Sequence, residues 1–247
     1  MNVSVVLPSF NRARLLPITI PTYFQEDVSE VILVDDCSSD NTAEVVKELQ
    51  TRFPTLRYFR NEVNSKQPYT QNVAISKVQS EYIYFGDDDS VLYPGSIRNL
   101  LNVMREKNAD IVGGRALALF FPEQIDELDE FLSHYRNRIA TEANQIVDLS
   151  TLSTNFTYTV KEPIRVPFCH ASCLCKTQVA REMQFDVKIE GNAYREETDF
   201  LIRATLAGYT IYYTSSANQI NLPSAMCSGG ARSKNHRHSV SYTHLTL

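Results

Sequence analysis

Three consecutive aspartates, Asp87, Asp88 and Asp89, come directly after the apolar and aromatic run of residues 82–86. A run of this kind predicts a strand buried inside a sheet. Three like charges at a strand end repel one another and are costly to remove from water. A divalent cation such as Mg²⁺ or Mn²⁺ would relieve both problems, because hard cations take carboxylate oxygens and share them with substrate phosphates. A solvated acidic turn would have the same composition, so the aspartates alone leave both interpretations open.

Two other predicted strands also end in polar residues. The strand predicted at residues 3–7 leads into Pro-Ser-Phe-Asn-Arg at 8–12, and the strand at 31–34 leads into Asp35 and Asp36. The carboxyl ends of parallel strands share one edge of a sheet, and ligands of α/β proteins bind there. We therefore expect these residues to lie near the three aspartates.

A helix predicted at residues 196–206 begins with Glu196, Glu197 and Asp199. Carboxylates in a first helical turn are stabilised by the helix dipole, which is the simpler interpretation. A carboxylate at such a position can also act as a general base toward a substrate hydroxyl. The helix alone does not decide between the two.

The elements that must hold these groups alternate along the first half of the chain. Strands are predicted at 3–7, 31–34, 56–59, 82–86 and 111–113, and helices at 13–23, 40–49, 68–77 and 94–107, with Asp40 as an N-cap and Pro94 at a first helical position. This alternation predicts a parallel sheet wound with helices. The pattern then loosens into an acidic helical stretch at 121–143, loops or edge strands at 148–162, and strands at 167–176 and 209–213.

The composition fits one large domain with a hydrophobic core, since 43% of the 247 residues are hydrophobic. The net charge is −5 and there is no long basic run, so nucleic acid is not expected as a partner. The chain enters a strand without a signal peptide and has no apolar stretch long enough to span a membrane. Its cysteines have the pattern of core thiols, which predicts a cytoplasmic protein.

Taken together, the order and spacing of these motifs resemble family 2 glycosyltransferases over roughly residues 1–232. The resemblance implies an α/β protein, a single GT-A (Rossmann-like) domain with a mainly parallel central sheet flanked by helices. Residues 1–114 would form the nucleotide-sugar-binding half, and residues 115–232 the acceptor-binding and catalytic half. Residues 233–247 are expected to be a truncated or non-native tail, because the segment 240–245 resembles a translated sequencing-library adapter.

The resemblance also assigns roles to single residues. It implies nucleotide contacts from the three strand ends and from the helix at 68–77, namely Pro8, Ser9, Asn11, Asp35, Asp36, Gln71, Asn72, Asp87 and Asp88. Asp36, with Asp35 as the alternative, would accept a hydrogen bond from the base, and Asp87 and Asp89 would hold Mn²⁺ or Mg²⁺. Glu197 would be the catalytic base, with Glu196 and Asp199 as neighbouring acids. His170 and Arg232 would contact the acceptor or a phosphate, although a lone histidine on an apolar strand is more often a core residue.

Two positions depart from the family pattern. Gln71 stands where many members have arginine, and Asn221 lies near the position of a metal-binding histidine, for which His236 or His238 could substitute. The predicted function is metal-dependent transfer of a sugar from a nucleoside-diphosphate donor, such as a UDP-sugar, to a sugar or lipid-linked acceptor, with inversion. At most peripheral membrane contact is expected, at the inner face. A catalytically impaired nucleotide-sugar-binding protein is the alternative; other nucleotide-binding folds are disfavoured by the absence of glycine-rich phosphate loops.

Overall fold

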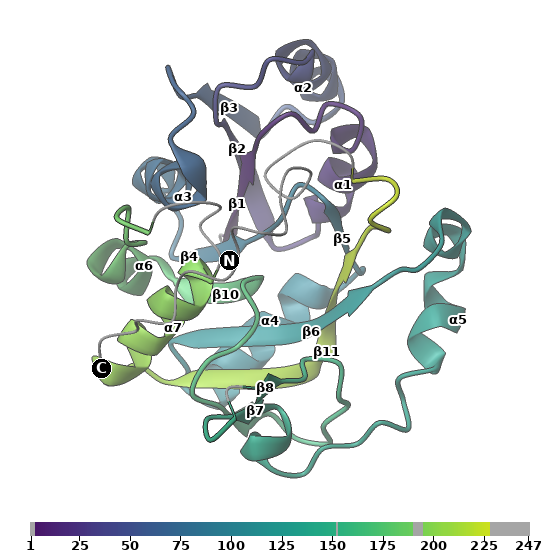
Figure 1. Ribbon diagram of the computed structural model, residues 1–247, viewed down its shortest axis with the longest axis vertical. Helices are drawn as coiled ribbons and strands as arrows, with labels where there is room; N and C mark the ends of the chain where they lie inside the picture. Colours follow the sequence, from purple (N-terminus) through teal and green to yellow (C-terminus); the bar gives the residue numbers. More distant parts are fainter. Residues whose placement is uncertain (1–2, 152, 190–194, 228–247) are drawn as a thin grey trace.

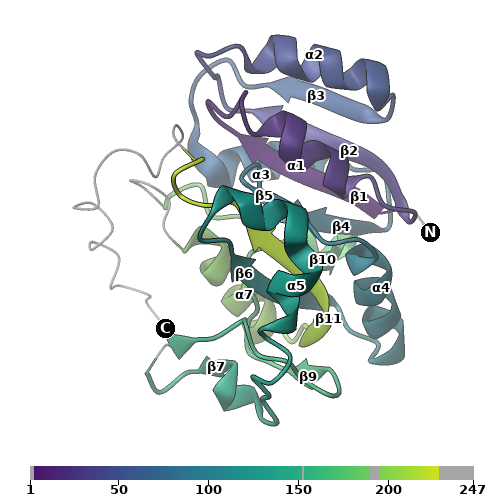
Figure 2. The same ribbon diagram turned by 90° about the vertical axis from the view of Figure 1, so that its right-hand side faces the viewer.

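The computed structural model describes residues 3–151, 153–189 and 195–227, which form a mixed sheet with helices on both faces (Figures 1 and 2). The strands are β1 Val3–Ser9, β2 Val28–Asp35, β3 Leu56–Arg60, β4 Tyr82–Phe85, β5 Ser90–Leu92, β6 Ile111–Ala118, β7 Val147–Asp148, β8 Ser153–Thr154, β9 Ile164–Arg165, β10 Cys173–Lys176 and β11 Ile211–Asn221. The helices are α1 Leu16–Tyr23, α2 Thr42–Arg52, α3 Lys66–Lys77, α4 Ser96–Glu106, α5 Leu128–Ser133, α6 Thr177–Met183 and α7 Glu196–Leu206, with short 3₁₀ turns η1 Pro122–Glu127 and η2 Ala143–Gln145.

The main sheet has the strand order β3-β2-β1-β4-β10-β6-β11-β5, with β9 on the side of β11. The longer ladders, which join β1 to β2, β2 to β3, β1 to β4 and β6 to β11, are all parallel. The antiparallel ladders of β10, β5 and β9 join only two or three residue pairs each. The predicted fold, a mainly parallel sheet between helices, is therefore confirmed.

Each face of the sheet has its own hydrophobic cluster, because the side chains of a strand alternate between the two faces. Val6 of β1 points to the cluster with α3, α6 and α7, whereas Leu7 points to the cluster with α1, α2 and α4. The continuous apolar runs of β1 and β2 follow from this burial on both faces. Within the described ranges, no helix has the length and apolar character needed to cross a membrane.

The structure differs from the predicted elements mainly near their ends. Helix α4 begins at Ser96 with Gly95 as its N-cap, so Pro94 precedes the helix instead of opening it. The N-cap of α2 is Asn41, and Asp40 instead accepts hydrogen bonds from the backbone and hydroxyl of Thr42. These errors arise because two or three neighbouring residues can serve as the helix cap almost equally well, and the backbone angles decide which of them does.

Three further differences concern whole elements. The strand predicted at 167–176 is regular only in β10, the helical stretch at 121–143 is broken into η1 and α5, and β5 was not predicted. Strand β5 has only three residues and pairs with the end of β11, so its signal comes from a partner more than a hundred residues away. Such pairings leave little trace in local periodicity.

Candidate active site

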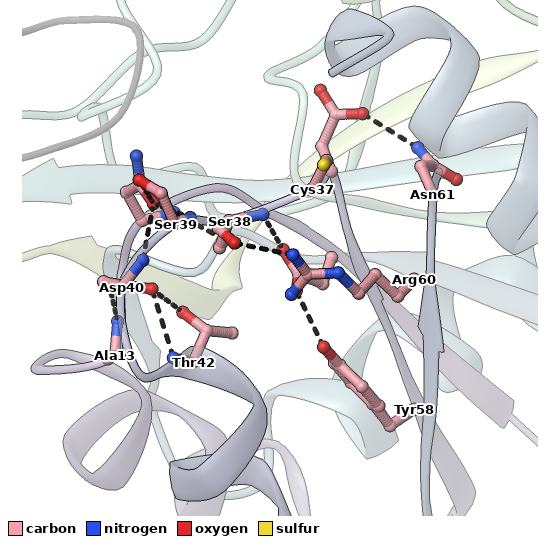
Figure 3. Close-up of polar contacts among 12 residues, drawn as sticks. Ala13, Cys37, Ser38, Ser39, Asp40, Thr42, Tyr58, Arg60 and Asn61 are labelled. Carbon is pink, nitrogen blue, oxygen red and sulfur yellow. Dashed lines mark hydrogen bonds and ion pairs between the residues drawn. The ribbon is translucent and has the colours of Figure 1, made fainter. Parts of the chain in front are cut away.

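The loops after β1 and β2 are tied together by side-chain hydrogen bonds (Figure 3). The Asn11 Oδ1 atom accepts from the backbone N–H of Ser39 at 2.8 Å, and the Asn11 N–H donates to the Ser38 hydroxyl at 2.8 Å. Asp40 closes the network by accepting from the backbone N–H of Ala13 at 3.1 Å. Asn11 therefore shapes the two loops predicted to hold the nucleotide, and its own amide oxygen is already used for that purpose.

Both aspartates after β2 are buried and hydrogen-bonded within the chain. Asp35 accepts from the Ser38 N–H at 2.8 Å, from the Tyr58 hydroxyl at 2.7 Å and from the Arg60 guanidinium at 2.9 Å. Figure 3 shows Tyr58 and Arg60 reaching this loop from β3. Burial and the hydrogen bond to Asp35 raise the pKa of Tyr58 to about 12. Asp35 thus anchors the loop to the neighbouring strand.

Asp36 anchors a different segment, the start of α3. Its carboxylate accepts from the Asn61 side chain and from the backbone N–H groups of Ser65 and Lys66, each at 2.8 Å. A carboxylate has about four acceptor positions, so three are occupied by the chain itself. The contact of Asp36 with a base remains a prediction, and in this structure its carboxylate orders the loop after β3.

The two residues predicted on α3 behave differently from each other. Asn72 forms two hydrogen bonds with the backbone of Phe185, at 2.9 and 2.8 Å, which fix α3 to the segment after α6. Gln71 is buried, and its Oε1 atom has no hydrogen-bond partner within the described chain. The buried Ser9 hydroxyl at the end of β1 lies beside Asp88, and its hydrogen bond to that carboxyl lowers the pKa of Asp88. An unpaired buried polar atom is costly, and Gln71 Oε1 lies in the predicted nucleotide region, where a bound polar ligand would satisfy it.

Asp87 faces the strands of the second half. Its Oδ2 atom accepts from the Gln219 amide at 2.8 Å and from the Ser172 hydroxyl at 3.1 Å. The buried Tyr23 hydroxyl donates to the Asp87 carbonyl at 2.8 Å and accepts from its N–H at 3.1 Å, which fixes the backbone of the motif. Gly86 is needed immediately before it, because a Cβ atom there would lie 2.7 Å from Leu7 and 2.9 Å from Tyr23.

Asp88 and Asp89 instead face Arg12, which contacts each carboxylate at 3.5 Å. Burial and the charge of Asp89 raise the pKa of Asp88 to about 7, and the charge of Arg12 opposes that rise. Among the described residues, the charge of Arg12 offsets only part of this rise in the pKa of Asp88. This electrostatic environment suits an additional cation.

The donor set for that cation is incomplete within the part of the chain that the structure describes. No three His, Cys, Asp or Glu side chains converge there as metal ligands. Mg²⁺ and Mn²⁺ are commonly held by one or two carboxylates, with substrate phosphates and water completing the shell. The aspartates at 87–89 therefore fit a cation that arrives with a diphosphate, and the assignment of Asp87 and Asp89 as its ligands remains a prediction.

Helix α7 brings its acidic first turn to the same place. Glu196 is only 4% exposed, and burial, the charge of Glu197 and the charge of Asp87 together raise the pKa of Glu196 to about 10. Glu197 is half-buried beside it. Asp199 accepts from Arg203 at 2.8 Å, one turn along the helix, and Arg203 also donates to the Met183 and Gln184 carbonyls. Asp199 therefore takes part in the contact between α7 and the end of α6.

The remaining predicted contacts are less central. His170 Nδ1 accepts from the Ser172 N–H at 3.2 Å, and the imidazole ring lies edge-to-face against Phe156. His170 therefore contacts both an aromatic residue and Ser172, a partner of Asp87. Asn221, at the end of β11, accepts from the Ser90 hydroxyl at 2.8 Å, and the next residue, Leu222, donates its N–H to the Asp89 carbonyl. Arg232, His236 and His238 lie outside the described residues.

Four residues of this site carried no predicted role: Arg12, Tyr23, Ser172 and Gln219. Arg12 belongs to the same motif as Asn11, and a signal existed there, because a cation beside three aspartates is electrostatically favourable. Gln219 and Tyr23 gave no comparable signal, since their importance depends on which strands and helices meet at Asp87.

The loops of the site also contain unusual backbone angles. Asn11, Cys37, Lys66 and Arg195 have positive φ angles between 55° and 72°, although none of them is glycine. Such angles cost free energy for residues with a Cβ atom, and they occur preferentially at functional sites. Asn108 and Gln184, outside these loops, also have positive φ angles, so the angles agree with a specialised site without defining it.

Known proteins with related sequences are glycosyltransferases. The GalNAc(5)-diNAcBac-PP-undecaprenol beta-1,3-glucosyltransferase of Campylobacter jejuni is 33% identical over 114 residues, which cover 45% of this chain and 37% of that protein. The poly(ribitol-phosphate) beta-N-acetylglucosaminyltransferase TarP of Staphylococcus aureus is 32% identical over 121 residues, covering 46% and 36% respectively. The chain thus matches little more than a third of the length of these relatives.

Solved structures share the fold. S. aureus TarS 1–349 in complex with UDP-GlcNAc superposes with a TM-score of 0.66 at 16% identity, covering 96% of this chain and 62% of that one. The mannosyltransferase PcManGT of Pyrobaculum calidifontis, in complex with GDP-Man and Mn²⁺, has a TM-score of 0.60 at 17% identity, covering 89% and 56%. The sequence model described as "Glycosyl transferase family 2" matches residues 4–173, from β1 to the first residue of β10, and the chain belongs to that family.

Proposed function

We propose that this chain transfers a sugar from a nucleoside-diphosphate donor to an acceptor hydroxyl, with inversion at the anomeric carbon. One observation carries the proposal: Phe200 of α7 packs edge-to-face against Phe85 at the end of β4, with ring centroids 5.8 Å apart, so the acidic turn of α7 and the aspartates after β4 border one site. The effect of the Asp87 charge on Glu196, family membership and the unpaired Gln71 Oε1 atom support it further.

The two glutamates of α7 have separate tasks in this mechanism. Glu196, protonated at neutral pH because its pKa is about 10, cannot take a proton. Glu197 is more accessible and takes the proton of the acceptor hydroxyl as that oxygen attacks the sugar. A single base without a covalent intermediate gives inversion, as it does in inverting glycosidases.

The nucleotide lies at the ends of β1 and β2 in this proposal. Asn11, Asp35 and Asp36 hold the loops in place, and the unpaired Gln71 Oε1 atom is available to bond the ligand. Asp87 and Asp89 would hold Mn²⁺ or Mg²⁺, which neutralises the charge that develops on the diphosphate leaving group. We expect a UDP-sugar or similar donor and a sugar or lipid-linked acceptor, in the cytoplasm or at the inner membrane face.

A second candidate is a protein of this fold that binds nucleotide sugars without turning them over. Gln71 and Asn221 favour it, because they stand where many family members have an arginine and a metal-binding histidine. The discriminating experiment measures binding and hydrolysis of UDP-, GDP- and dTDP-sugars with Mn²⁺, Mg²⁺ or EDTA. Metal-dependent hydrolysis of one donor supports the enzyme, binding without any turnover supports the alternative, and absence of binding to every donor contradicts both.

A further inference from the structure

Arg12 is a buried arginine that joins three parts of the candidate site. Its side chain is 6% exposed, and its Nη1 atom donates to the Cys227 carbonyl at 2.7 Å. Its Nε atom lies 3.5 Å from Asp88 Oδ1, and its Nη2 atom lies 3.5 Å from Asp89 Oδ2. The loop after β1, the acidic motif and the segment after β11 therefore meet at one guanidinium group.

The geometry of these contacts indicates a charge pairing that can be exchanged. Strong charge-assisted hydrogen bonds are about 2.7–2.9 Å long, and the bond to the carbonyl of Cys227 has that length. The contacts to the two carboxylates are longer, and they are shared between two separate acids instead of forming a two-pronged bond to one. Arginine stays protonated, so Arg12 offsets part of the negative charge of Asp88 and Asp89. Its contacts with them are too long for strong hydrogen bonds.

We propose that Arg12 is the resident counter-ion of the Asp88–Asp89 pair and releases Asp89 to a divalent cation, held there together with Asp87, when the donor diphosphate arrives. This inference rests on the function proposed above. After the exchange, the guanidinium group remains beside the site through its bond to Cys227, and the diphosphate oxygens become its new anionic partners. The cation and the nucleotide therefore bind together more readily than the cation alone.

The proposal predicts two effects of opposite sign when the charge of Arg12 is removed. Without nucleotide, a divalent cation no longer competes with the guanidinium group, so its affinity for the protein rises. With the cation bound, the diphosphate lacks an arginine partner, so nucleotide affinity falls. A purely structural arginine would not produce this reversal, because loss of local structure weakens both binding steps.

The experiment compares the wild type with Arg12→Gln by calorimetry. Mn²⁺ is titrated into protein without nucleotide, and UDP is titrated at saturating Mn²⁺. We expect Mn²⁺ to bind about tenfold more tightly and UDP about tenfold more weakly in the variant, consistent with a charge a few ångströms away. Arg14→Gln is the matched control, because Arg14 is exposed and donates to the neighbouring Met226 carbonyl. It should leave both affinities within about twofold, the range of a surface substitution.

Unchanged or weaker Mn²⁺ binding in folded Arg12→Gln overturns the proposal. If that variant does not fold, Arg12→Met replaces it, because methionine keeps an apolar stem in the buried position and removes the charge. Mn²⁺ should then also bind more tightly than to the wild type, and an unchanged affinity is again contrary to the proposal. Failure of the wild type to bind UDP or any UDP-sugar refutes the proposed function separately, while the Mn²⁺ titration still tests Arg12.

Discussion

Asp35 and Asp36, at the end of β2, and Glu196, at the start of α7, are similarly buried, yet their surroundings are opposite. Asp35 and Asp36 each receive three hydrogen bonds from their own chain. Glu196 is surrounded by like charges, and its pKa is raised far above the usual value. The comparison separates two uses of a buried acid. Asp35 and Asp36 hold loops in shape, whereas Glu196 is kept in an environment that is unfavourable for its charge, as is common at functional sites.

The largest expected effect is on catalysis by the acids of α7. Glu197→Gln keeps the size of the side chain but cannot accept a proton, so turnover should fall by about 10²–10⁴-fold, the usual contribution of a general base. Donor affinity should change little, as measured by calorimetry with UDP. Asp199→Asn is the matched control and should retain most activity, because Asp199 pairs with Arg203. Full turnover in Glu197→Gln would show that Glu197 is not the catalytic base.

The next effect concerns stability and the acids after β2. Asp35→Ala leaves the Tyr58 hydroxyl and the Ser38 N–H without their partner, so the free energy of unfolding should fall by about 2–3 kcal/mol. Urea unfolding monitored by circular dichroism measures this difference. Glu48→Ala, an exposed acid on α2, should change it by less than about 0.5 kcal/mol. Equal stabilities of the two variants would contradict an anchoring role for Asp35.

A third prediction uses the pH dependence of stability. In the folded protein Glu196 keeps its proton up to a pKa of about 10, whereas in the unfolded chain it loses it near pH 4.5. Between these values the folded state binds more protons, so stability decreases as pH rises, by at most about 1.4 kcal/mol per pH unit. Glu196→Gln removes this pH-dependent contribution to stability. Between pH 6 and 9, the urea midpoint of the variant should therefore fall less steeply than that of the wild type. Parallel pH profiles for the two proteins would contradict the buried, protonated Glu196.

The smallest expected effect is a gain in stability in the loop after β2. Cys37 has a φ of 63°, an angle that costs about 1–2 kcal/mol for a residue with a Cβ atom. Cys37→Gly removes this strain but adds flexibility to the unfolded chain, so the free energy of unfolding should rise by about 0.5–1 kcal/mol. Ala43→Gly in α2 is the control and should lower it by about 1 kcal/mol. A loss of stability in both variants would show that the loop relaxes without cost.

The local sequence predicted the helices and strands better than it predicted the side-chain hydrogen bonds of the site. The apolar runs of β1 and β2 and the first residue of α7 followed from periodicity and from the acids at 196–199. The motifs singled out Asn11, Asp35 and Asp36 as site residues, which stays a prediction, but did not predict their hydrogen bonds to the chain itself, because a sequence motif does not show which atoms remain available for a ligand. Arg12 and Gln219 were missed as partners of the aspartates, since those pairings span 77 and 132 positions along the chain.

Strand β10 lies between β4 and β6 although it follows both of them in the chain, which has a consequence for biosynthesis. While the chain emerges from the ribosome, β1 to β4 can pair as soon as they are made, but the edge of β4 stays open until residues 173–176 appear. Exposed strand edges are templates for wrong pairing between chains. A nascent chain arrested before β10 should therefore depend on chaperones, whereas one that has passed β11 can close its sheet without help.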